Sequence, residues 1–328
     1  MSISVYVTRR IPDEGLALLR EHCDAVEVHA GEGPPSRRDL LTGVKGRDGL
    51  LCLLSDRIDA EVFDTAGPQL RAVANYAVGY DNIDVAEATR RRIPVSNTPG
   101  VLTETTGDLA WALMFAAARR VLEGDRMVRS GGWGGWGPMQ LLGVDVWGST
   151  LGVVGGGRIG AAVARRAAGF RMEVLYCDPR PCPELEAECG ARRLPLDELL
   201  GEADFVSLHV PLTDETRHMI GARELRLMKR TAVLVNTSRG PVIDEAALAD
   251  ALRDGRIFAA GLDVYEREPA LAPGLADLGN VVLLPHLGSA TGRTRGRMAR
   301  MAAGGLLAML RSECPPNCVN PEVLGGRR

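Results

Sequence analysis

Three residues whose side chains perform acid–base and anion-binding chemistry each follow a short apolar run in the C-terminal half of the chain. Arg239, Glu268 and His286 come after the runs at 232–235, 259–262 and 281–284, respectively. A guanidinium binds a carboxylate through two parallel hydrogen bonds. An imidazole exchanges a proton near neutral pH, and a carboxylate beside it orients the ring and favours its charged form. These residue types therefore indicate a site that binds an anion and transfers a proton.

The same set of groups suits the reduction of a 2-oxo acid, which carries a carboxylate beside a ketone. Hydride attack places negative charge on the ketone oxygen, which then needs a proton and a cationic neighbour. We expect Arg239 to bridge carboxylate and ketone, His286 to donate the proton and Glu268 to orient His286. Each residue alone has a simpler explanation, as a surface charge, a loop residue or a structural histidine. Their joint position matters because the carboxyl ends of parallel strands meet at one ligand crevice.

A hydride source is indicated by the segment Gly-Gly-Gly-Arg-Ile-Gly at 155–160, which matches the pattern G-x-G-x-x-G. The bare pattern is weak, because glycine-rich turns are common. Here it directly follows the apolar run 151–154 and opens a helix of small residues at 161–168. This context predicts a tight turn that brings the pyrophosphate of a dinucleotide to a helix N-terminus.

Asp178 ends the next apolar run, 18 residues after Gly160. A carboxylate at this point accepts hydrogen bonds from the adenosine ribose and repels a 2′-phosphate. The alternative is an ordinary Asp-Pro turn, and Arg180 is close enough in sequence to help hold a phosphate. We therefore expect NAD(H) to be preferred, with NADP(H) as a possible cofactor.

The elements that must position these residues form two stretches of strand–helix alternation. Apolar runs lie at 3–8, 25–29, 49–54 and 70–77, and again at 150–154, 173–177, 205–210, 232–236, 259–262 and 281–284. Short strands separated by helices predict parallel sheets covered on both faces. The expected fold class is α/β, with two Rossmann-like or flavodoxin-like doubly wound parallel-sheet domains and a cleft between them.

A length of 328 residues suits two domains. A long helix is predicted over 103–120, and the glycine-rich segment 131–138 is predicted to be a loop. The last forty residues read as mainly helical and are too few for a domain, so we expect them to return to the first one. The predicted division is a substrate-binding domain of residues 1–100 and 289–328, with a dinucleotide-binding Rossmann domain of residues 101–288 inserted in it.

The composition is that of an ordinary soluble globular protein. Apolar residues make up 45% and charged residues 25%, and the net charge of −3 gives no reason to expect nucleic acid or an anionic membrane as a partner. The apolar run at the start is short and is followed by Arg9 and Arg10, so we expect no signal peptide and a cytoplasmic location. The seven cysteines are expected to be reduced, and a metal clip at Cys314 and Cys318 is disfavoured because no histidine lies nearby. No metal site is expected.

Over essentially its whole length the sequence resembles the D-isomer-specific 2-hydroxyacid dehydrogenase family. The segments 236–240, 261–269 and 284–291 are similar to the family's Arg, Glu and His motifs. The resemblance implies Arg239 as substrate binder, Glu268 as acid partner and His286 as proton donor, with Asp263 facing the nicotinamide carboxamide. The cofactor contacts that it implies are Gly155, Gly156, Gly157, Arg158, Ile159, Gly160, Asp178, Val210, Pro211, Thr237, Ser238, Arg239, Asp263, His286 and Gly288.

Within the family the resemblance is to glyoxylate/hydroxypyruvate reductases, through segments 75–84, 133–146 and 287–295. It implies Val78 and Gly79 as substrate-binding residues. They end a predicted strand, where backbone N–H groups are able to grip a carboxylate, although a plain β-turn at Gly79 is the alternative. Two positions depart from the pattern: Gly156 stands where relatives carry a larger apolar residue, and Asp178 replaces the polar pattern of NADPH-using reductases.

The resemblance also implies a homodimer formed through the dinucleotide domain. Trp133 and Trp136, in the glycine-rich loop, either face a second subunit or fold back on their own domain. Two other functions stay open: another D-2-hydroxyacid dehydrogenase of the phosphoglycerate type, and a dinucleotide-sensing regulator that resembles corepressors. The full set of Arg239, Glu268 and His286 favours an enzyme over a regulator.

Overall fold

The computed structural model describes residues 2–325 and divides the chain into two compact units. Unit 1 combines the residues up to Leu102 with those from Ala290 onward, and unit 2 runs from Thr103 to Ser289. Both units are α/β structures with an all-parallel sheet, which confirms the predicted fold class. Within the described part of the chain, no helix is long and apolar enough to cross a membrane.

Unit 1 is built on a parallel sheet with the strand order β2-β1-β3-β4-β5. Its strands are β1 (Ser4–Val7), β2 (Ala25–Val28), β3 (Gly49–Cys52), β4 (Ala72–Asn75) and β5 (Val95–Ser96). Its helices are α1 (Asp13–His22), α2 (Arg37–Val44), α3 (Ala60–Ala66), α4 (Val85–Arg90) and α12 (Gly292–Leu310). α12 packs against α1, and the side chains of Leu16, Leu19, Ala299 and Leu306 join one core with β1 and β3. The C-terminal helix thus belongs to the same core as the first strand.

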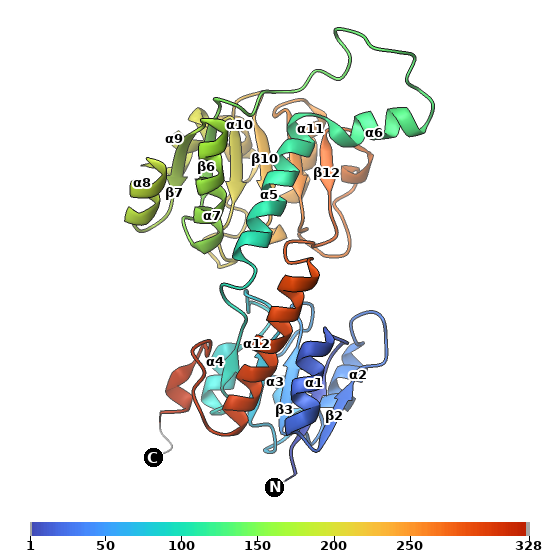
Figure 1. Cartoon of the computed structure of the whole chain (residues 1–328), viewed down its shortest axis with the longest axis vertical. Helices are drawn as coiled ribbons and strands as arrows, with labels where there is room; N and C mark the ends of the chain where they lie inside the picture. The colour runs from blue at the N-terminus through green and yellow to red at the C-terminus, as the bar shows by residue number, and fades with distance from the viewer. Residues whose placement is uncertain (1, 326–328) are drawn as a thin grey trace. The chain divides into compact units, whose positions relative to one another are not determined.

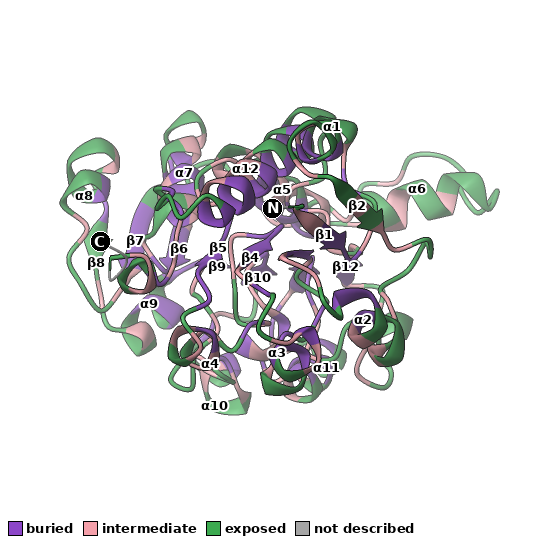
Figure 2. Ribbon diagram, turned by 90° about the horizontal axis from the view of Figure 1, so that it is seen from below, coloured by how far each residue is buried: buried purple, intermediate pink, exposed green. Residues whose placement is uncertain are grey.

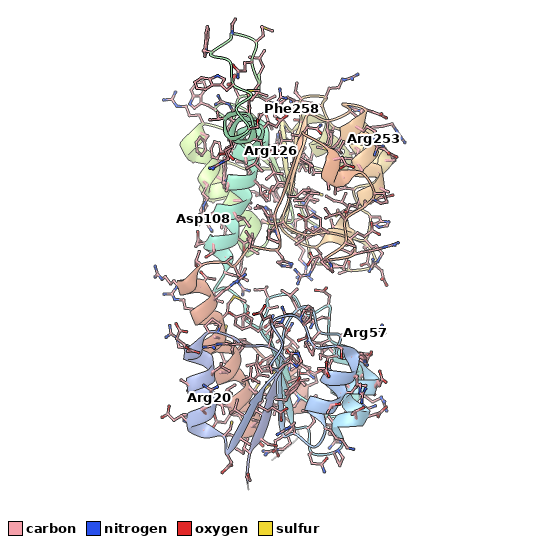
Figure 3. The ribbon with its side chains drawn as sticks, turned by 90° about the vertical axis from the view of Figure 1, so that its right-hand side faces the viewer. Arg20, Arg57, Asp108, Arg126, Arg253 and Phe258 are labelled. Carbon is pink, nitrogen blue, oxygen red and sulfur yellow. The ribbon has the colours of Figure 1, made fainter. Side chains whose placement is uncertain are left out.

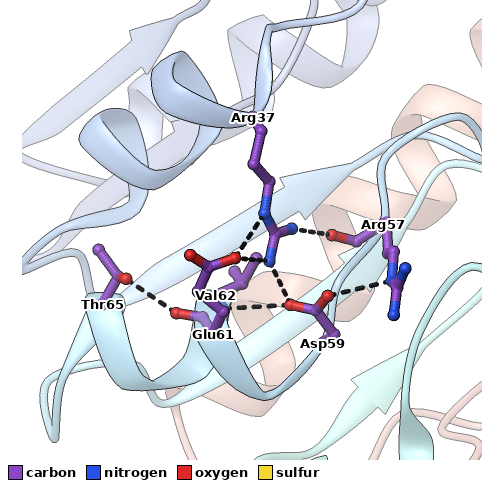
Figure 4. A network of polar contacts seen from close by, with 6 residues as sticks. All are labelled: Arg37, Arg57, Asp59, Glu61, Val62 and Thr65. Atoms are coloured by element: carbon purple, nitrogen blue, oxygen red, sulfur yellow. Dashed lines mark hydrogen bonds and ion pairs between the residues drawn. The ribbon is translucent and has the colours of Figure 1, made fainter.

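A network of charges joins α2 to the start of α3 (Figure 4). Asp59 caps α3 by accepting a hydrogen bond from Val62 N, and Arg37 of α2 pairs with both Asp59 and Glu61. Burial raises the pKa of Asp59, but the hydrogen bond and charge of Arg37 outweigh it and the net pKa is lowered. Because these ion pairs are largely exposed, they contribute little to the free energy of unfolding. Their main effect is to fix the residue at which α3 begins.

Unit 2 contains a larger parallel sheet with the order β12-β11-β10-β9-β6-β7-β8. Its strands are β6 (Thr150–Val154), β7 (Glu173–Cys177), β8 (Arg192–Arg193), β9 (Phe205–Leu208), β10 (Val233–Asn236), β11 (Ala259–Leu262) and β12 (Val281–Leu283). Its helices are α5 (Thr103–Ala118), α6 (Val121–Arg129), α7 (Arg158–Ala167), α8 (Pro183–Cys189), α9 (Leu196–Glu202), α10 (Ala222–Leu227) and α11 (Glu245–Arg253). The reversal of strand order between β6 and β9 is where a doubly wound sheet binds its ligand.

Two apolar clusters cover the faces of this sheet. β9, β10 and β11 are buried along their whole length, and in Figure 2 central strands such as β6 are purple. On one face Trp111 of α5 stacks on Phe170, with ring centroids 4.9 Å apart. Arg166 of α7 pairs with Asp108, labelled on α5 in Figure 3. The central strands read as continuous apolar runs because both of their faces are covered.

The segment between α5 and β6 packs little against the rest of unit 2. The predicted helix 103–120 ends at Ala118, and Arg120 takes a left-handed conformation with φ 53° before α6 starts. α6 has no buried residue, and the loop that follows it, through residue 149, forms no helix or strand. Figure 1 shows α6 and this loop standing out from the sheet of unit 2.

Candidate active site

The glycine loop joins β6 to α7 in a turn that only small residues allow. Gly155 has φ 97°, and a Cβ atom there would lie 2.8 Å from the carbonyl carbon of His209. A Cβ at Gly160 would lie 2.0 Å from the carbonyl oxygen of Gly155. The turn therefore packs against the end of β9 on one side and against its own helix on the other.

The start of α7 fits the phosphates of a dinucleotide. Gly157 is the N-cap residue, and no side chain caps the helix. A Cβ at Gly157 would meet no atom within 4 Å, so the space beside the N-cap residue is open. Arg158 is exposed at the first helical position, and Ile159 follows it. A helix N-terminus without a cap is a ready anion-binding site.

Asp178 directly follows β7 and binds the glycine loop. Its Oδ2 accepts a hydrogen bond of 2.9 Å from Gly156 N, and its Oδ1 accepts one of 3.0 Å from Arg180 N. A Cβ at Gly156 would lie 2.5 Å from Cys182 Sγ. Cys182 thus occupies the space that a larger residue at position 156 would need, which explains the departure at Gly156.

The end of β9 lies against this loop and carries His209, Val210 and Pro211. His209 Nε2 lies 2.8 Å from Ser207 Oγ, and its Nδ1 is buried without a partner among the described residues. Burial lowers the pKa of His209 to about 3, so this imidazole is neutral at ordinary pH. Val210 is half-buried and Pro211 is exposed.

The Arg239 loop is shaped by Asn236, the last residue of β10. The buried Asn236 amide donates to the carbonyl oxygen of Arg239 at 2.9 Å and accepts from Ser238 N at 2.9 Å. Thr237 is buried between them, and its hydroxyl finds no partner within residues 2–325. An orphaned buried hydroxyl suits a ligand group, so Thr237 fits its implied contact with a cofactor.

Gly240 brings this loop against the next one. A Cβ there would lie 1.8 Å from the carbonyl carbon of Tyr265 and 2.4 Å from Glu266 N. The two backbones therefore touch, and the Arg239 charge acts on Glu268, lowering the pKa of that carboxyl. Any side chain at position 240 would separate the two loops.

Glu268 and His286 form a hydrogen-bonded pair. His286 Nδ1 lies 3.1 Å from Glu268 Oε2, and Tyr265 N donates to Glu268 Oε1 at 3.1 Å. Burial raises the pKa of Glu268, but the hydrogen bond and charge of His286 outweigh it, and the net pKa is lowered. The carboxylate is thus kept ionised beside the ring, which directs Nε2 away from it.

Asp263, just after β11, holds the segment that carries His286. Its two carboxylate oxygens accept hydrogen bonds of 2.6 Å from Leu287 N and 2.8 Å from Gly288 N. Burial raises the pKa of Asp263, against the effect of these two N–H groups and of the His286 charge. His286 has φ 57°, a left-handed conformation that is costly for this residue and that these contacts maintain.

Val78 and Gly79 lie in unit 1, in a bend after β4. The predicted strand 70–77 ends early, at Asn75, whose side chain turns back to bind the carbonyl oxygen of Gly79 at 2.9 Å. The carbonyl oxygen of Val78 accepts from Asn97 Nδ2 at 2.7 Å. The N–H groups of Val78 and Gly79 have no acceptor among the residues that the structure describes, which is an arrangement suited to an anion.

Unit 2 therefore brings together Arg239, Glu268, His286 and Asp263 at the carboxyl ends of β10, β11 and β12. Sequence reasoning missed the residues that shape these loops: Asn236, Gly240, Tyr265 and Glu245. Two of them carry a sequence signal, because an Asn at the end of an apolar run and a Gly directly after Arg239 are typical of tight loops.

A doubly wound domain with a glycine loop and an Arg–Glu–His set defines a nicotinamide-dependent oxidoreductase. The model of the family described as "D-isomer specific 2-hydroxyacid dehydrogenase, NAD binding domain" matches residues 111–288. The chain belongs to this family, and the resemblance found in the sequence is confirmed.

Known proteins are similar to this chain over nearly its whole length. A glyoxylate reductase of Korarchaeum cryptofilum is 58% identical, over 99% of this chain and 98% of its own. A solved NADPH-dependent glyoxylate/hydroxypyruvate reductase of Sinorhizobium meliloti, in complex with NADP and malonate, is 32% identical with a TM-score of 0.85, over 98% of each chain. A D-lactate dehydrogenase of Aquifex aeolicus, complexed with NAD and lactic acid, is 26% identical with a TM-score of 0.83, over 97% of this chain and 99% of that one.

Proposed function

We propose that this enzyme reduces glyoxylate or hydroxypyruvate to the corresponding 2-hydroxy acid. The observation that carries the proposal is the His286–Glu268 pair, with an ionised carboxylate 3.1 Å from Nδ1, beside the loop of Arg239. The full-length similarity to a glyoxylate reductase supports the choice of substrate class.

Each residue has a defined part in the proposed reaction. The Arg239 guanidinium binds the substrate carboxylate and the ketone oxygen. The imidazolium of His286 donates a proton from Nε2 to that oxygen, while Glu268 stabilises the charged ring and fixes its orientation. A bound nicotinamide cofactor supplies the hydride. We also propose Val78 and Gly79 as substrate-binding residues, on the basis of their unengaged N–H groups.

Among the cofactors we propose that NAD(H) is preferred over NADP(H). The residues proposed to hold the dinucleotide are those of the glycine loop, Asp178, Val210 and Pro211, the segment 237–239, Asp263, His286 and Gly288. The carboxylate of Asp178 supports the preference, since its charge opposes that of a 2′-phosphate. Asp178→Ser should therefore raise NADPH affinity relative to NADH, as measured by quenching of protein fluorescence.

The test of the function is a panel of kcat/KM values for glyoxylate, hydroxypyruvate, pyruvate and phosphohydroxypyruvate with NADH and with NADPH. We expect the first two acids with NADH to give the highest values. His286→Ala should lower turnover by about 10²- to 10⁴-fold, the usual effect of losing a general acid, while NADH still binds. Absence of turnover with every acid would contradict the proposal, and a high value for phosphohydroxypyruvate alone would redirect it.

We further propose a homodimer formed through unit 2. α6 has no buried residue, and several apolar side chains on it and on its loop are exposed: Val121, Leu122, Val128, Trp133, Trp136, Met139 and Leu142. A cavity of about 210 Å³ next to α6, lined in part by Ala116, Phe258 and Val281, offers apolar surface to a partner. α6 carries acidic and basic residues at its two ends, which is compatible with pairing against a second copy of itself about a two-fold axis.

A further inference from the structure

A buried carboxylate outside the catalytic set binds the loop that carries Glu268. Glu245 is the first residue of α11 and is only 4% exposed. Its Oε2 accepts a hydrogen bond of 2.7 Å from Glu266 N, and its Oε1 accepts one of 2.7 Å from Ala272 N. Both oxygens are thus used by backbone N–H groups more than twenty residues away in sequence.

These two N–H groups flank the turn on which Glu268 lies. Ala270 N donates to the carbonyl oxygen of Arg267 at 2.9 Å, so Glu268 and Pro269 occupy the tip of a turn. Glu266 precedes this turn and Ala272 follows it. A single carboxylate therefore ties both sides of the turn to the start of one helix.

Glu245 is held in place from its own side as well. Its backbone N donates to Glu266 Oε2 at 3.4 Å, so the two residues bind each other, and the helix N-terminus favours its negative charge. Within residues 2–325 no arginine, lysine or histidine forms an ion pair with Glu245. Both carboxylate oxygens are satisfied by backbone N–H groups on one loop, so the side chain acts on the position of that loop and not on a cation.

We propose that Glu245 is a positioning residue, which fixes the turn that presents Glu268 to His286 and so sets the pH range of proton donation. The proposal rests on the function proposed above. Few contacts separate Glu245 from His286. Glu245 binds Glu266 N, and Glu268 accepts from the preceding Tyr265 N with one oxygen and contacts His286 Nδ1 with the other. The other titratable or charged groups near this pair are Arg239, Asp263, Tyr265 and the His218–Glu266 pair.

Glu245→Gln tests the proposal, because the amide keeps the size of the side chain but places an NH₂ group against one of the two N–H donors. A shift of about 1 Å in a catalytic group costs up to about 10²-fold in rate. We therefore expect kcat/KM for glyoxylate to fall by about 10- to 100-fold, and reductive turnover to decline at a lower pH than in the wild type. NADH affinity should not change. Asp250→Asn, on the exposed side of the same helix, is the matched control and should leave the rate and the pH profile unchanged.

A second measurement does not depend on turnover. The ring signals of His286 in the NMR spectrum should shift in Glu245→Gln relative to the wild type, and the amides of Glu266 and Ala272 should exchange faster. If the wild type reduced none of the acids while these changes occurred, the proposed function alone would be wrong. Unchanged ring signals of His286 together with an unchanged pH profile in a folded variant would overturn the role of Glu245.

Discussion

At the scale of single residues, the proposed chemistry depends on a few atoms that hydrogen bonds to backbone or charged groups hold in place. Glu268 touches His286 with one oxygen and a backbone N–H with the other, and Asp263 fixes the segment that bears the imidazole. The left-handed backbone at His286 shows that this position is imposed by its surroundings. A histidine held in this way is oriented before any substrate arrives.

Glu268→Gln should shift the pH range of the reaction. The pKa of Glu268 is held below its usual value by His286, so the carboxylate is charged throughout the working range and favours the imidazolium. Without this charge the imidazolium is no longer favoured, and reductive turnover should decline at a lower pH than in the wild type. The pH dependence of kcat checks this, with Asp277→Asn as an exposed control; an unchanged profile would mean that Glu268 does not act on the ring.

His209→Gln should alter the pH dependence of stability. The pKa of His209 falls from 6.5 to about 3 on folding, so between these values the unfolded chain binds the extra proton and stability declines as the pH falls. The slope is at most about 1.4 kcal/mol per pH unit, the limit for one proton. The glutamine variant should therefore lose less stability than the wild type from pH 6.5 to pH 4.5 in thermal unfolding. His22→Gln, at an exposed position, should behave as the wild type does.

At the scale of elements, the site depends on loops that touch at their backbones. The loop after β10 meets the loop after β11 at Gly240, and α11 binds the second of these through Glu245. On the loops themselves these contacts use backbone atoms, so they do not occupy the side chains of Arg239 and Glu268 that we propose to act on the substrate. A parallel sheet supports this because neighbouring strands end at the same edge.

Gly240→Ala should separate the two loops. Its Cβ would lie 1.8 Å from the carbonyl carbon of Tyr265, an overlap that neither backbone relieves without moving. We expect a loss of about 1–3 kcal/mol in stability, as for other overpacked sites, and a fall in kcat/KM of at least about tenfold. Gly201→Ala in α9, where a Cβ meets no atom within 4 Å, is the matched control. Near-normal turnover in Gly240→Ala would show that the contact between the loops is dispensable.

At the scale of the whole molecule, α6 and its loop carry apolar side chains that a single chain leaves exposed to water. Trp136 is 84% exposed and Met139 is 77% exposed, on a segment that stands out from its own sheet (Figure 1). Exposed apolar surface of this kind is typical of protein–protein interfaces, which supports the proposed dimer.

Replacing Trp136 and Met139 together with serine should weaken the proposed dimer. Sedimentation at micromolar concentration should show a dimer for the wild type and a shift toward monomer for the double variant, because aromatic anchors carry much of an interface's free energy. Leu227→Ser removes an exposed apolar side chain elsewhere in unit 2 and should leave the dimer intact. A monomeric wild type would refute the dimer directly.

The sequence by itself determined those features that depend on residues close together in the chain. The glycine loop behind an apolar run, Asp178 after the next run, and three chemically suited residues at strand ends are all visible as short patterns, because each depends on residues close together in the chain. The parallel fold class followed from the same alternation. The family resemblance then supplied the expected roles, which spacing alone leaves open.

Only the tertiary structure decided what holds these residues in position. Glu245 binds Ala272 across 27 positions, Gly240 faces Tyr265, and Cys182 fills the space beside Gly156. Sequence periodicity reports which face of an element is buried, but not which distant backbone lies against it. The groups that we propose to react were therefore predicted from the sequence, whereas the contacts that fix their geometry are visible only in the folded chain.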